Sequence, residues 1–380
     1  MTDLPGAVRA YARRMHAAIG ESHHVASPLG AWLVLALAAS AARGDEADRL
    51  GEVLGMPVGD AARAARALLD EPHPAVAAAA AAWSRAAGGP AAEWLAGLPD
   101  AVERGPVPGQ AEADEWARRN TFGLVEAFPL DLDRVWDCVL ASALATRIAW
   151  AQPFETAASR EFRSAWRDRV RRVLTTPVRG HDCSIVAHPD AGDLAVHRAA
   201  ADGLQVTSVI AESGVAATEV LDAAHEVALD ALPRTSLFDL PLGDGPSWTI
   251  TESDGAAGRE EVAAVLPAWS ATSRHELTRP EFGFGPAAGV LRRLFCAPEW
   301  DARQTAVARF HRTGFEAAAV TALAVAVSLR VPRRGRQRAA LLRFDRPYAV
   351  VAHVDTRYPA PWRLLPVFSA WVTDPEDAAG

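Results

Sequence analysis

The chain has 380 residues, of which 50% are hydrophobic, and its formal net charge is −8. A chain of this length and composition can bury a sizeable core, as one large domain or as two or three ordinary ones. The negative charge excludes a general affinity for nucleic acids or anionic membranes. No apolar run reaches the roughly 18 residues that a membrane-spanning helix needs.

The cysteines and the first residues of the chain indicate in which cellular compartment the protein is expected. Cys138, Cys183 and Cys296 lack metal-type spacing, so we expect free thiols in a reducing compartment. No basic, apolar and small-residue signal precedes residues 7–19. We therefore expect a cytoplasmic protein, although secretion by an unrecognised route stays open.

Apolar residues recur at helical spacing in the first third of the chain. Helices are expected at residues 6–19, Trp32–Ser40, Asp45–Leu54, Asp60–Leu69 and Ala111–Phe128. A short edge element, His24–Leu29, precedes the second helix. Pro74–Trp83 fits a helix or a buried strand, and residues 88–108 are expected as a loop with a short helix.

From residue 135 onward, short runs typical of β-strands follow one another. They are Val135–Ala149, Val170–Thr175, Ser184–Ala187, Gln205–Ala211, Glu226–Leu229, Ser247–Ile250, Glu261–Leu266 and Thr305–Phe310. No repeat or long linker interrupts them, so we expect one domain over residues 1–380.

The segment Arg312–Leu342 combines two opposite chemistries. Ala317–Val327 is small and apolar, and could cross a sheet as a buried strand. Arg330–Arg338 carries five arginines and should be solvated. A core-like strand next to a charged tip indicates a loop with two possible locations.

Outside this segment, the sequence offers few groupings of chemically reactive residues. His181, Asp182, Cys183 and His188 invite a metal interpretation, but neighbours in a strand point to opposite faces, which disfavours convergent ligands. No G-x-S-x-G elbow marks a nucleophile. We therefore expect no metal, no cofactor and no catalytic residue.

Two motifs resemble the serpins, in particular a divergent bacterial-type member. The run Gly314–Thr321 resembles the serpin hinge, and Phe344–Tyr348 resembles the motif that follows the serpin reactive-centre loop. Trp116, Thr121 and Gly123 also fit a serpin helix signature. The resemblance implies an α+β serpin fold with about three β-sheets, eight or nine helices and an exposed mobile loop at about 312–342.

The resemblance also implies a function and a set of site residues. A serpin-type inhibitor is cut in its loop by a serine protease, and the cut loop then inserts into the main sheet before the acyl-enzyme is hydrolysed. The matching hinge residues are Gly314, Phe315, Glu316, Ala317, Ala318, Ala319 and Thr321. The matching residues where the sheet opens are Trp150, Ser27, Ser142 and Gln304.

Two family spacings disagree on the scissile bond. Counting from Gly314 gives Ser328–Leu329, which suits an elastase-like or subtilisin-like protease. Counting back from Phe344 gives Arg336–Gln337, which suits a trypsin-like protease. The sequence favours Arg336–Gln337 because an arginine-rich segment is expected to be exposed; the alternative is that these arginines serve only to keep an apolar loop soluble.

Several positions depart from the family pattern. Phe315 stands where threonine is usual, and Arg312 replaces an acidic residue. Gly30, Ser142 and Gln304 replace serine, asparagine and histidine. The first hypothesis is a monomeric inhibitor of a serine or possibly a cysteine protease. The alternative is a non-inhibitory serpin-fold protein that binds a peptide or small molecule, or has acquired an enzymatic site in a biosynthetic pathway.

Overall fold

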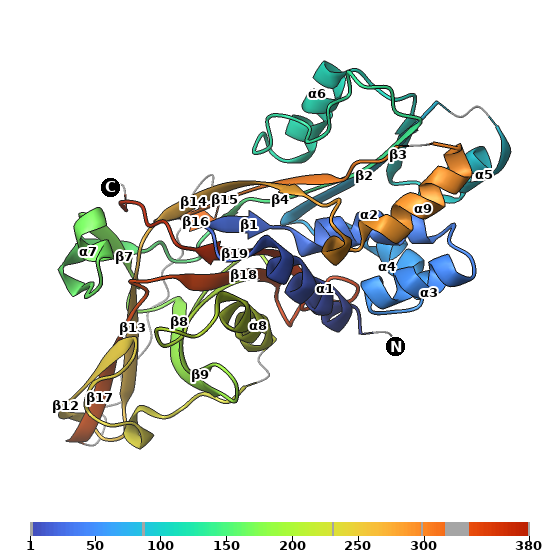
Figure 1. The fold of residues 1–380 in the computed structure, drawn as a ribbon. Coiled ribbons are helices and arrows are strands. Elements are labelled where there is room, and N and C mark those ends of the chain that lie inside the picture. Colours follow the sequence, from blue (N-terminus) through green and yellow to red (C-terminus); the bar gives the residue numbers. More distant parts are fainter. Residues whose placement is uncertain (1–2, 86–87, 230–231, 298, 316–333, 379–380) are drawn as a thin grey trace.

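The computed structural model describes residues 3–85, 88–229, 232–297, 299–315 and 334–378, which form a mixed α+β structure (Figure 1). The α-helices in these ranges are α1 (Leu4–Ile19), α2 (Pro28–Ala39), α3 (Asp45–Leu54), α4 (Val58–Asp70), α5 (Gly89–Gly97), α6 (Gln110–Asn120), α7 (Trp166–Arg169), α8 (Ala217–Ala228) and α9 (Phe284–Phe295). The strands are β1 (His24–Ala26), β2 (Val76–Ser84), β3 (Val102–Gly105), β4 (Cys138–Thr146), β5 (Ile148–Ala149), β6 (Glu155–Ala158), β7 (Arg172–Thr175), β8 (His181–His188), β9 (Gly192–Ala201), β10 (Leu204–Ile210), β11 (Gly243–Asp244), β12 (Trp248–Ala256), β13 (Glu260–Leu266), β14 (Trp269–Glu276), β15 (Arg303–His311), β16 (Gly314–Phe315), β17 (Arg334–Arg343), β18 (Tyr348–Val354) and β19 (Pro366–Val372).

The described strands form four hydrogen-bonded sheets. Two have six strands, in the orders β1-β19-β18-β10-β9-β8 and β11-β12-β17-β13-β7-β6. The other two have the orders β14-β15-β16-β5 and β3-β2-β4. Because β5 follows β4 after the single residue Arg147, these two smaller sheets are continuous at one end. Figure 1 shows them along one side of the molecule, with α6 beyond them.

Helix α2 lies beneath the two smaller sheets and is apolar around its whole circumference, as expected of a central buried helix. Its start is well defined in sequence, since Pro28 occupies the first turn and the Ser27 hydroxyl accepts a hydrogen bond from the Gly30 amide. Trp32 is fully buried, and its indole N–H donates to the Leu54 carbonyl. The helix therefore forms a fixed floor for the strands above it.

The α+β architecture expected from sequence is confirmed, and several individual segments need correction. Glu226–Leu229 is not a strand, because it lies at the end of α8. The helix expected at Ala111–Phe128 ends at Asn120, since Phe122 and Gly123 take left-handed backbone conformations. Pro74–Trp83 is resolved in favour of a strand, β2, which pairs with β3 and β4.

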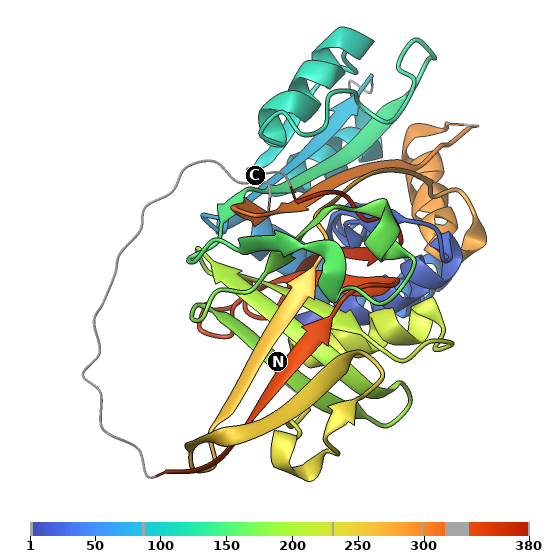
Figure 2. The same ribbon diagram turned by 90° about the vertical axis from the view of Figure 1, so that its left-hand side faces the viewer.

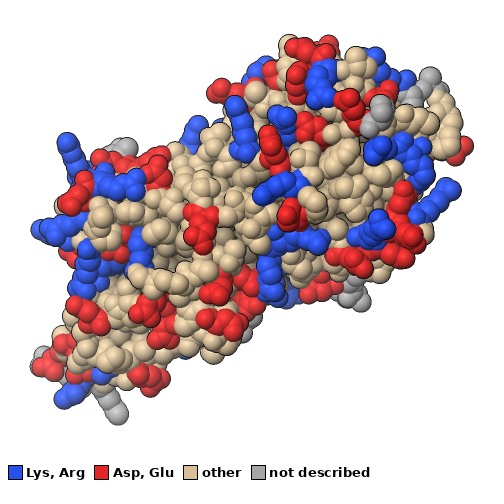
Figure 3. Space-filling view, in the orientation of Figure 1, with Lys and Arg blue, Asp and Glu red and all other residues tan. Residues whose placement is uncertain are grey.

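On the face seen in the orientation of Figure 1, the charged residues are spread out rather than gathered in one field. Figure 3 shows cations and anions interspersed over the visible face. No helix in the described part of the chain combines the length and the apolar character needed to cross a membrane.

Candidate functional site: a slot between β4 and β15

The two smaller sheets leave a strand-wide slot between β4 and β15. One edge of β4 pairs with β2 over the whole strand, and β15 pairs with β14 in the same way. Toward the slot, β15 pairs only at its last residues, Phe310 and His311, and no other described strand joins the facing edges. A cavity of about 730 Å³ occupies this region. Two unpaired strand edges that face each other can accept a further strand.

The slot is enclosed mainly by apolar side chains. Its floor comes from α2 and α9, with Ala31, Val34 and Leu291 among the lining residues. On the opposite side lie α6 and the chain that follows it. There Trp116 packs edge-to-face on Trp83 of β2, with ring centroids 5.3 Å apart. The slot is therefore a low-polarity environment. Burying backbone N–H and C=O groups there would cost free energy unless they form hydrogen bonds with the neighbouring strands.

The middle of the floor is polar. The Ser142 hydroxyl of β4 donates to the Gly30 carbonyl at 2.7 Å. The Gln304 side chain of β15 accepts from the Ser27 amide at 3.0 Å and donates to the Ser27 carbonyl at 2.9 Å. Each strand is thus tied to the start of α2. These bonds differ from the family pattern in their residues, as the sequence predicts.

The upper end of the slot is already occupied by β16. Gly314 pairs with Ala149 of β5 and with His311 of β15, and Phe315 pairs with Ile148 and Phe310. The Phe315 side chain is only 3% exposed and lies edge-to-face near Trp269, with centroids 6.3 Å apart. The first two hinge residues are therefore inserted between the two sheets in this structure. Phe315, the bulky departure from the family pattern, is already buried.

Trp150 joins the strands at this upper end. Its indole N–H donates to the His311 carbonyl at 2.9 Å, and its amide donates to the Thr313 carbonyl. The ring is buried and packs near Phe310 and Phe154. Trp150 is thus positioned beside β16, and the sheet-opening role that the resemblance gives it stays a prediction.

A histidine pair lies behind this aromatic cluster. His181 and His197 share a hydrogen bond of 2.9 Å between Nδ1 and Nε2, and His181 Nε2 lies 2.7 Å from the Gln152 carbonyl. If His181 Nε2 carries a proton to donate to that carbonyl, its Nδ1 accepts from His197. Burial holds the pKa of both histidines below the usual range, and for His197 well below it. The pair is neutral at ordinary pH.

The chain that follows residue 333 is held in its sheet quite differently from β16. β17 lies inside its sheet, antiparallel to β12 over nine residue pairs and parallel to β13 over six (Figure 2). The Arg338 side chain donates to the carbonyls of Leu237 and Leu240 and bonds to Glu252. The C-terminal part of the segment expected as an exposed loop is therefore a paired strand.

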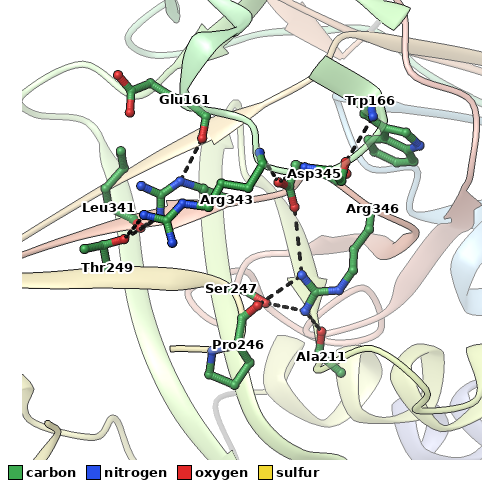
Figure 4. A network of polar contacts seen from close by, with 12 residues as sticks. Glu161, Trp166, Ala211, Pro246, Ser247, Thr249, Leu341, Arg343, Asp345 and Arg346 are labelled. Carbon is green, nitrogen blue, oxygen red and sulfur yellow. Dashed lines mark hydrogen bonds and ion pairs between the residues drawn. The ribbon is translucent and has the colours of Figure 1, made fainter. Parts of the chain in front are cut away.

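The residues that follow β17 are also held by several hydrogen bonds. The Asp345 carboxylate accepts from the amides of Arg163 and Ser164, at 2.7 and 3.1 Å. Arg346 donates to the Ala211 carbonyl and to Ser247 (Figure 4). The conspicuous motif Phe344–Tyr348 thus acts structurally, by anchoring the chain that leaves β17.

The structure separates the two candidate scissile bonds. Arg336 and Gln337 lie within β17 opposite Asp254 and Ser253, although the Arg336 side chain is 77% exposed. Ser328 and Leu329 fall outside the described residues, as do the hinge residues Glu316, Ala317, Ala318, Ala319 and Thr321. Of the expected hinge, Gly314 and Phe315 are placed, beside Trp150. Ser27, Ser142 and Gln304 come together in the middle of the slot.

Sequence reasoning missed a chain of buried histidines outside the slot. His16 Nδ1 lies 2.8 Å from His24 Nε2, and His16 Nε2 lies 2.6 Å from the Ser369 hydroxyl. His225 and His275 lie nearby. His16 and His24 lie on the consecutive elements α1 and β1, but Ser369, His225 and His275 come from distant parts of the chain, so no local pattern signals the cluster. In the described ranges, no group of histidine, cysteine or acidic residues could hold a metal ion.

These features define a class of protein whose main sheet has a vacant strand position, with the adjoining chain segment entering its upper end. No protein-family model matches the sequence, and no curated protein matches it. Solved structures do match. Thyroxine-binding globulin in complex with thyroxine is 16% identical with a TM-score of 0.63, over 98% of this chain and 99% of that chain.

Two further solved structures are similar to this chain over almost its whole length. The thermophilic serpin Tengpin in its native state is 12% identical with a TM-score of 0.66, over 98% of this chain and 93% of that chain. Serpin48 of the insect Tenebrio molitor, described as highly specific, is 17% identical with a TM-score of 0.60, over 98% and 99% of the two chains. The chain therefore has the serpin fold.

Proposed function

We propose that this protein is a serpin-type protease inhibitor that traps a serine protease by inserting its cut loop between β4 and β15. The observation that carries the proposal is the slot itself. Two unpaired edges face each other, and β16 already enters their upper end. Among the similar structures are native Tengpin and the specific Serpin48, and both are serpins.

We place the scissile bond at Ser328–Leu329. The alternative, Arg336–Gln337, has its backbone engaged in the ladder with β12, and the Arg336 carbonyl accepts from the Gly258 amide at 3.0 Å. A protease has to bind its substrate in an extended form with free backbone groups, so a bond upstream of Arg334 suits it better. The target is then a protease of elastase-like or subtilisin-like specificity.

The chemistry would follow the usual course of acyl transfer. The protease serine oxygen attacks the Ser328 carbonyl carbon and forms an ester, while the serine proton passes through the protease histidine to the departing Leu329 amine. The freed end then enters the slot. Each ladder hydrogen bond contributes about 0.5–1.5 kcal/mol net, and buried apolar side chains add to this, so some ten residues release on the order of 10 kcal/mol or more.

A gel experiment tests the proposal directly. The purified protein is mixed with subtilisin, elastase and trypsin in turn, and the products are separated under denaturing conditions. We expect a heat- and detergent-stable band at the summed mass, sensitive to hydroxylamine because the link is an ester. Complete cleavage with full residual protease activity would contradict inhibition, and Leu329→Pro should abolish the band by blocking cleavage there.

One observation favours a second candidate, a non-inhibitory ligand carrier. The cavity of about 730 Å³ has a volume typical of small-molecule pockets and a mostly apolar lining with aromatic rings such as Trp116 and Phe128. One similar structure is a globulin that binds thyroxine. Quenching of tryptophan fluorescence by thyroxine, used as a probe, would support this candidate if the protein also fails to trap proteases.

A further inference from the structure

A hydrogen-bonded network of buried side chains links α1, β1 and β19 outside the slot. The Ser22 carbonyl can only accept, so His24 Nδ1, which lies 2.8 Å away, carries a proton. A neutral His24 then accepts at Nε2 from His16 Nδ1, at 2.8 Å. His16 Nε2 in turn accepts from the Ser369 hydroxyl at 2.6 Å. In this network, called the His16 network below, every ring nitrogen is used and each histidine carries one proton.

An added proton cannot enter the His16 network without breaking it or leaving a buried charge. Protonation of His24 turns its Nε2 into a second donor, which then faces the His16 N–H and loses that bond. Protonation of His16 leaves a charged ring on a residue that is 1% exposed. Burial, followed by the neighbouring histidines of β1, α8 and β14, holds the pKa of His16 well below the usual range. The network is therefore stable only while both rings are neutral.

Strand β1 connects the His16 network to β14 and β15. The Val25 amide donates to the Ser273 hydroxyl oxygen at 3.0 Å, and His275 Nε2 donates to the Val25 carbonyl at 2.8 Å. His275 keeps this donor in either protonation state, because an added proton would go to its Nδ1. Ser27, which follows β1, bonds to Gln304 of β15. The position of β1 therefore affects both strands.

The charged groups around the network are already engaged with one another. Helix α1 lies against α8 and β19 (Figure 1). Its Arg9 and Arg13 pair with Glu226 and Asp222 of α8. Asp222 raises the pKa of His225, but burial outweighs this effect and lowers that pKa to about 4. Among the described residues, no carboxylate raises the pKa of the two network histidines. The titratable and charged groups around the network are Arg9 and Arg13 of α1, His23 before β1, His188 of β8, Arg198 of β9, Asp222, His225 and Glu226 of α8, His275 of β14, His353 of β18 and Asp355 after β18.

We propose that the His16 network is an acid-sensitive lock, which holds α1 and β1 on β14 and β19 while it is neutral and releases them when it is protonated. At neutral pH the lock stays closed, because opening would expose the apolar face of α1 that includes Val8, Tyr11 and Met15. In the open form the histidines take up protons at their ordinary pKa of about 6.5, whereas burial lowers the pKa of His24 in the closed form to about 4. Between these values, the opening constant rises about tenfold per pH unit of acidification for each histidine that is freed.

The test measures the opening of α1 with a buried thiol. Val8→Cys places a sulfur at a fully buried position of α1, where a dithiodipyridine reagent reaches it only when the helix opens. The labelling rate is measured from neutral pH to about pH 4, with the labelled residue identified by mass spectrometry, and is divided by the rate in the unfolded protein. We expect this ratio to rise by more than about tenfold per pH unit, because His16 and His24 are freed together. The half-buried Cys183 of β8, outside the lock, should stay protected.

Single substitutions in the Val8→Cys protein identify the sensing residues. His16→Asn and His24→Asn each remove a titratable ring and keep a neutral amide that can donate and accept. Each should speed labelling at neutral pH and reduce its rise in acid by about tenfold per pH unit. The matched control is His73→Asn, which changes another buried histidine of lowered pKa that packs near Trp362 and lies outside the network. It should leave the acid dependence unchanged.

Three results would overturn the lock. The first is a labelling rate at residue 8 that does not change with pH. The second is an unchanged acid dependence in His16→Asn and His24→Asn, and either variant alone decides this if the other fails to fold. The third is equal flattening by His73→Asn, or labelling of Cys183 together with residue 8, since acid would then unfold the protein as a whole.

Discussion

The two ends of residues 316–333 are attached to sheets of opposite character. At the N-terminal end, β16 enters a sheet with a vacant strand position. At the C-terminal end, β17 is paired on both sides and is held by Arg338. The first sheet can gain a strand and the second cannot easily lose one. Rearrangement of this segment should therefore proceed from its N-terminal end only.

Because of this difference, we expect that the segment after Phe315 can fill the slot only after the chain is cut. Filling the slot from residue 316 down to Cys138 takes about ten residues, a length of roughly 33 Å. The remaining residues, 326–333, span at most about 28 Å. β17 lies in the sheet at the far end of the molecule from α6 (Figure 1), so we expect residues 326–333 to be too short to return from the bottom of the slot to Arg334. Either the chain is cut or β17 leaves its sheet.

The largest expected effect is on the cut protein. Cleavage by subtilisin near Ser328 should raise the thermal midpoint by about 12 °C, because a stabilisation on the order of 10 kcal/mol shifts the midpoint of a chain of this size by about that much. Ala319→Arg should abolish the rise, since this residue would face the core beside Ala306. Scanning calorimetry before and after cleavage measures both.

Val327→Arg is the matched control for that prediction. The same substitution lies beyond the residues that would fill the slot, so the rise should persist. An equal rise in Ala319→Arg and the wild type would contradict insertion in the direction set by β16.

The second prediction concerns the uncut chain. About twenty glycine and serine residues inserted after Pro332 should allow the uncut loop to fill the slot, because the tether then reaches. On prolonged warming this variant should convert to a form with a raised thermal midpoint and an intact chain on a denaturing gel. The wild type should not convert.

The same insertion after Gly214, in an exposed turn, controls for added length alone. Conversion of the uncut wild type would show that β17 leaves its sheet readily. Failure of the lengthened variant, when the cut wild type does gain stability, would show that the tether is not what blocks insertion.

The third prediction tests what holds β17. Arg338→Ala should lower the free energy of unfolding of the uncut protein by about 1–3 kcal/mol, since this side chain is 15% exposed and bonds to two carbonyls and to Glu252. Arg336→Ala removes the same charge from the same strand, and Arg336 also contacts Glu252, but its side chain is 77% exposed. It should cost less than about 1 kcal/mol. Guanidinium unfolding distinguishes the two.

The last prediction concerns acid, which should act on one side of the comparison. Burial lowers the pKa of His24 and of His225 to about 4, and that of His353 to about 3. Between pH 6.5 and about 4 the unfolded chain binds more protons than the folded one, so the free energy of unfolding falls as the pH falls. The six-stranded sheet that contains β17 has no histidine in its strands. Hydrogen exchange at pH 5 should therefore increase first around α1, β1 and β14, and a uniform response would contradict this.

The sequence alone determined much of the framework. Helix starts such as Ser27-Pro28, the buried helix α2 and the alternation in β15 are local signals, and the hinge and the Phe344–Tyr348 motif led to the serpin fold. Trp150, Ser142 and Gln304 lie around the slot, and the roles that the resemblance gives them stay predictions. The framework could be predicted because capping, hydrophobic periodicity and short motifs depend on residues close together in the chain.

Only the tertiary structure decided the rest, because it depends on pairing between distant segments. Nothing local in Arg334–Arg343 shows that β12 and β13 flank it, so its arginines suggest a solvated loop until the ladder is seen. Likewise, β2 is a strand rather than a helix because β3 and β4 bury it, and residues 226–228 are helical within α8. The vacancy between β4 and β15 is a property of two edges more than 150 residues apart, and no stretch of sequence encodes it alone.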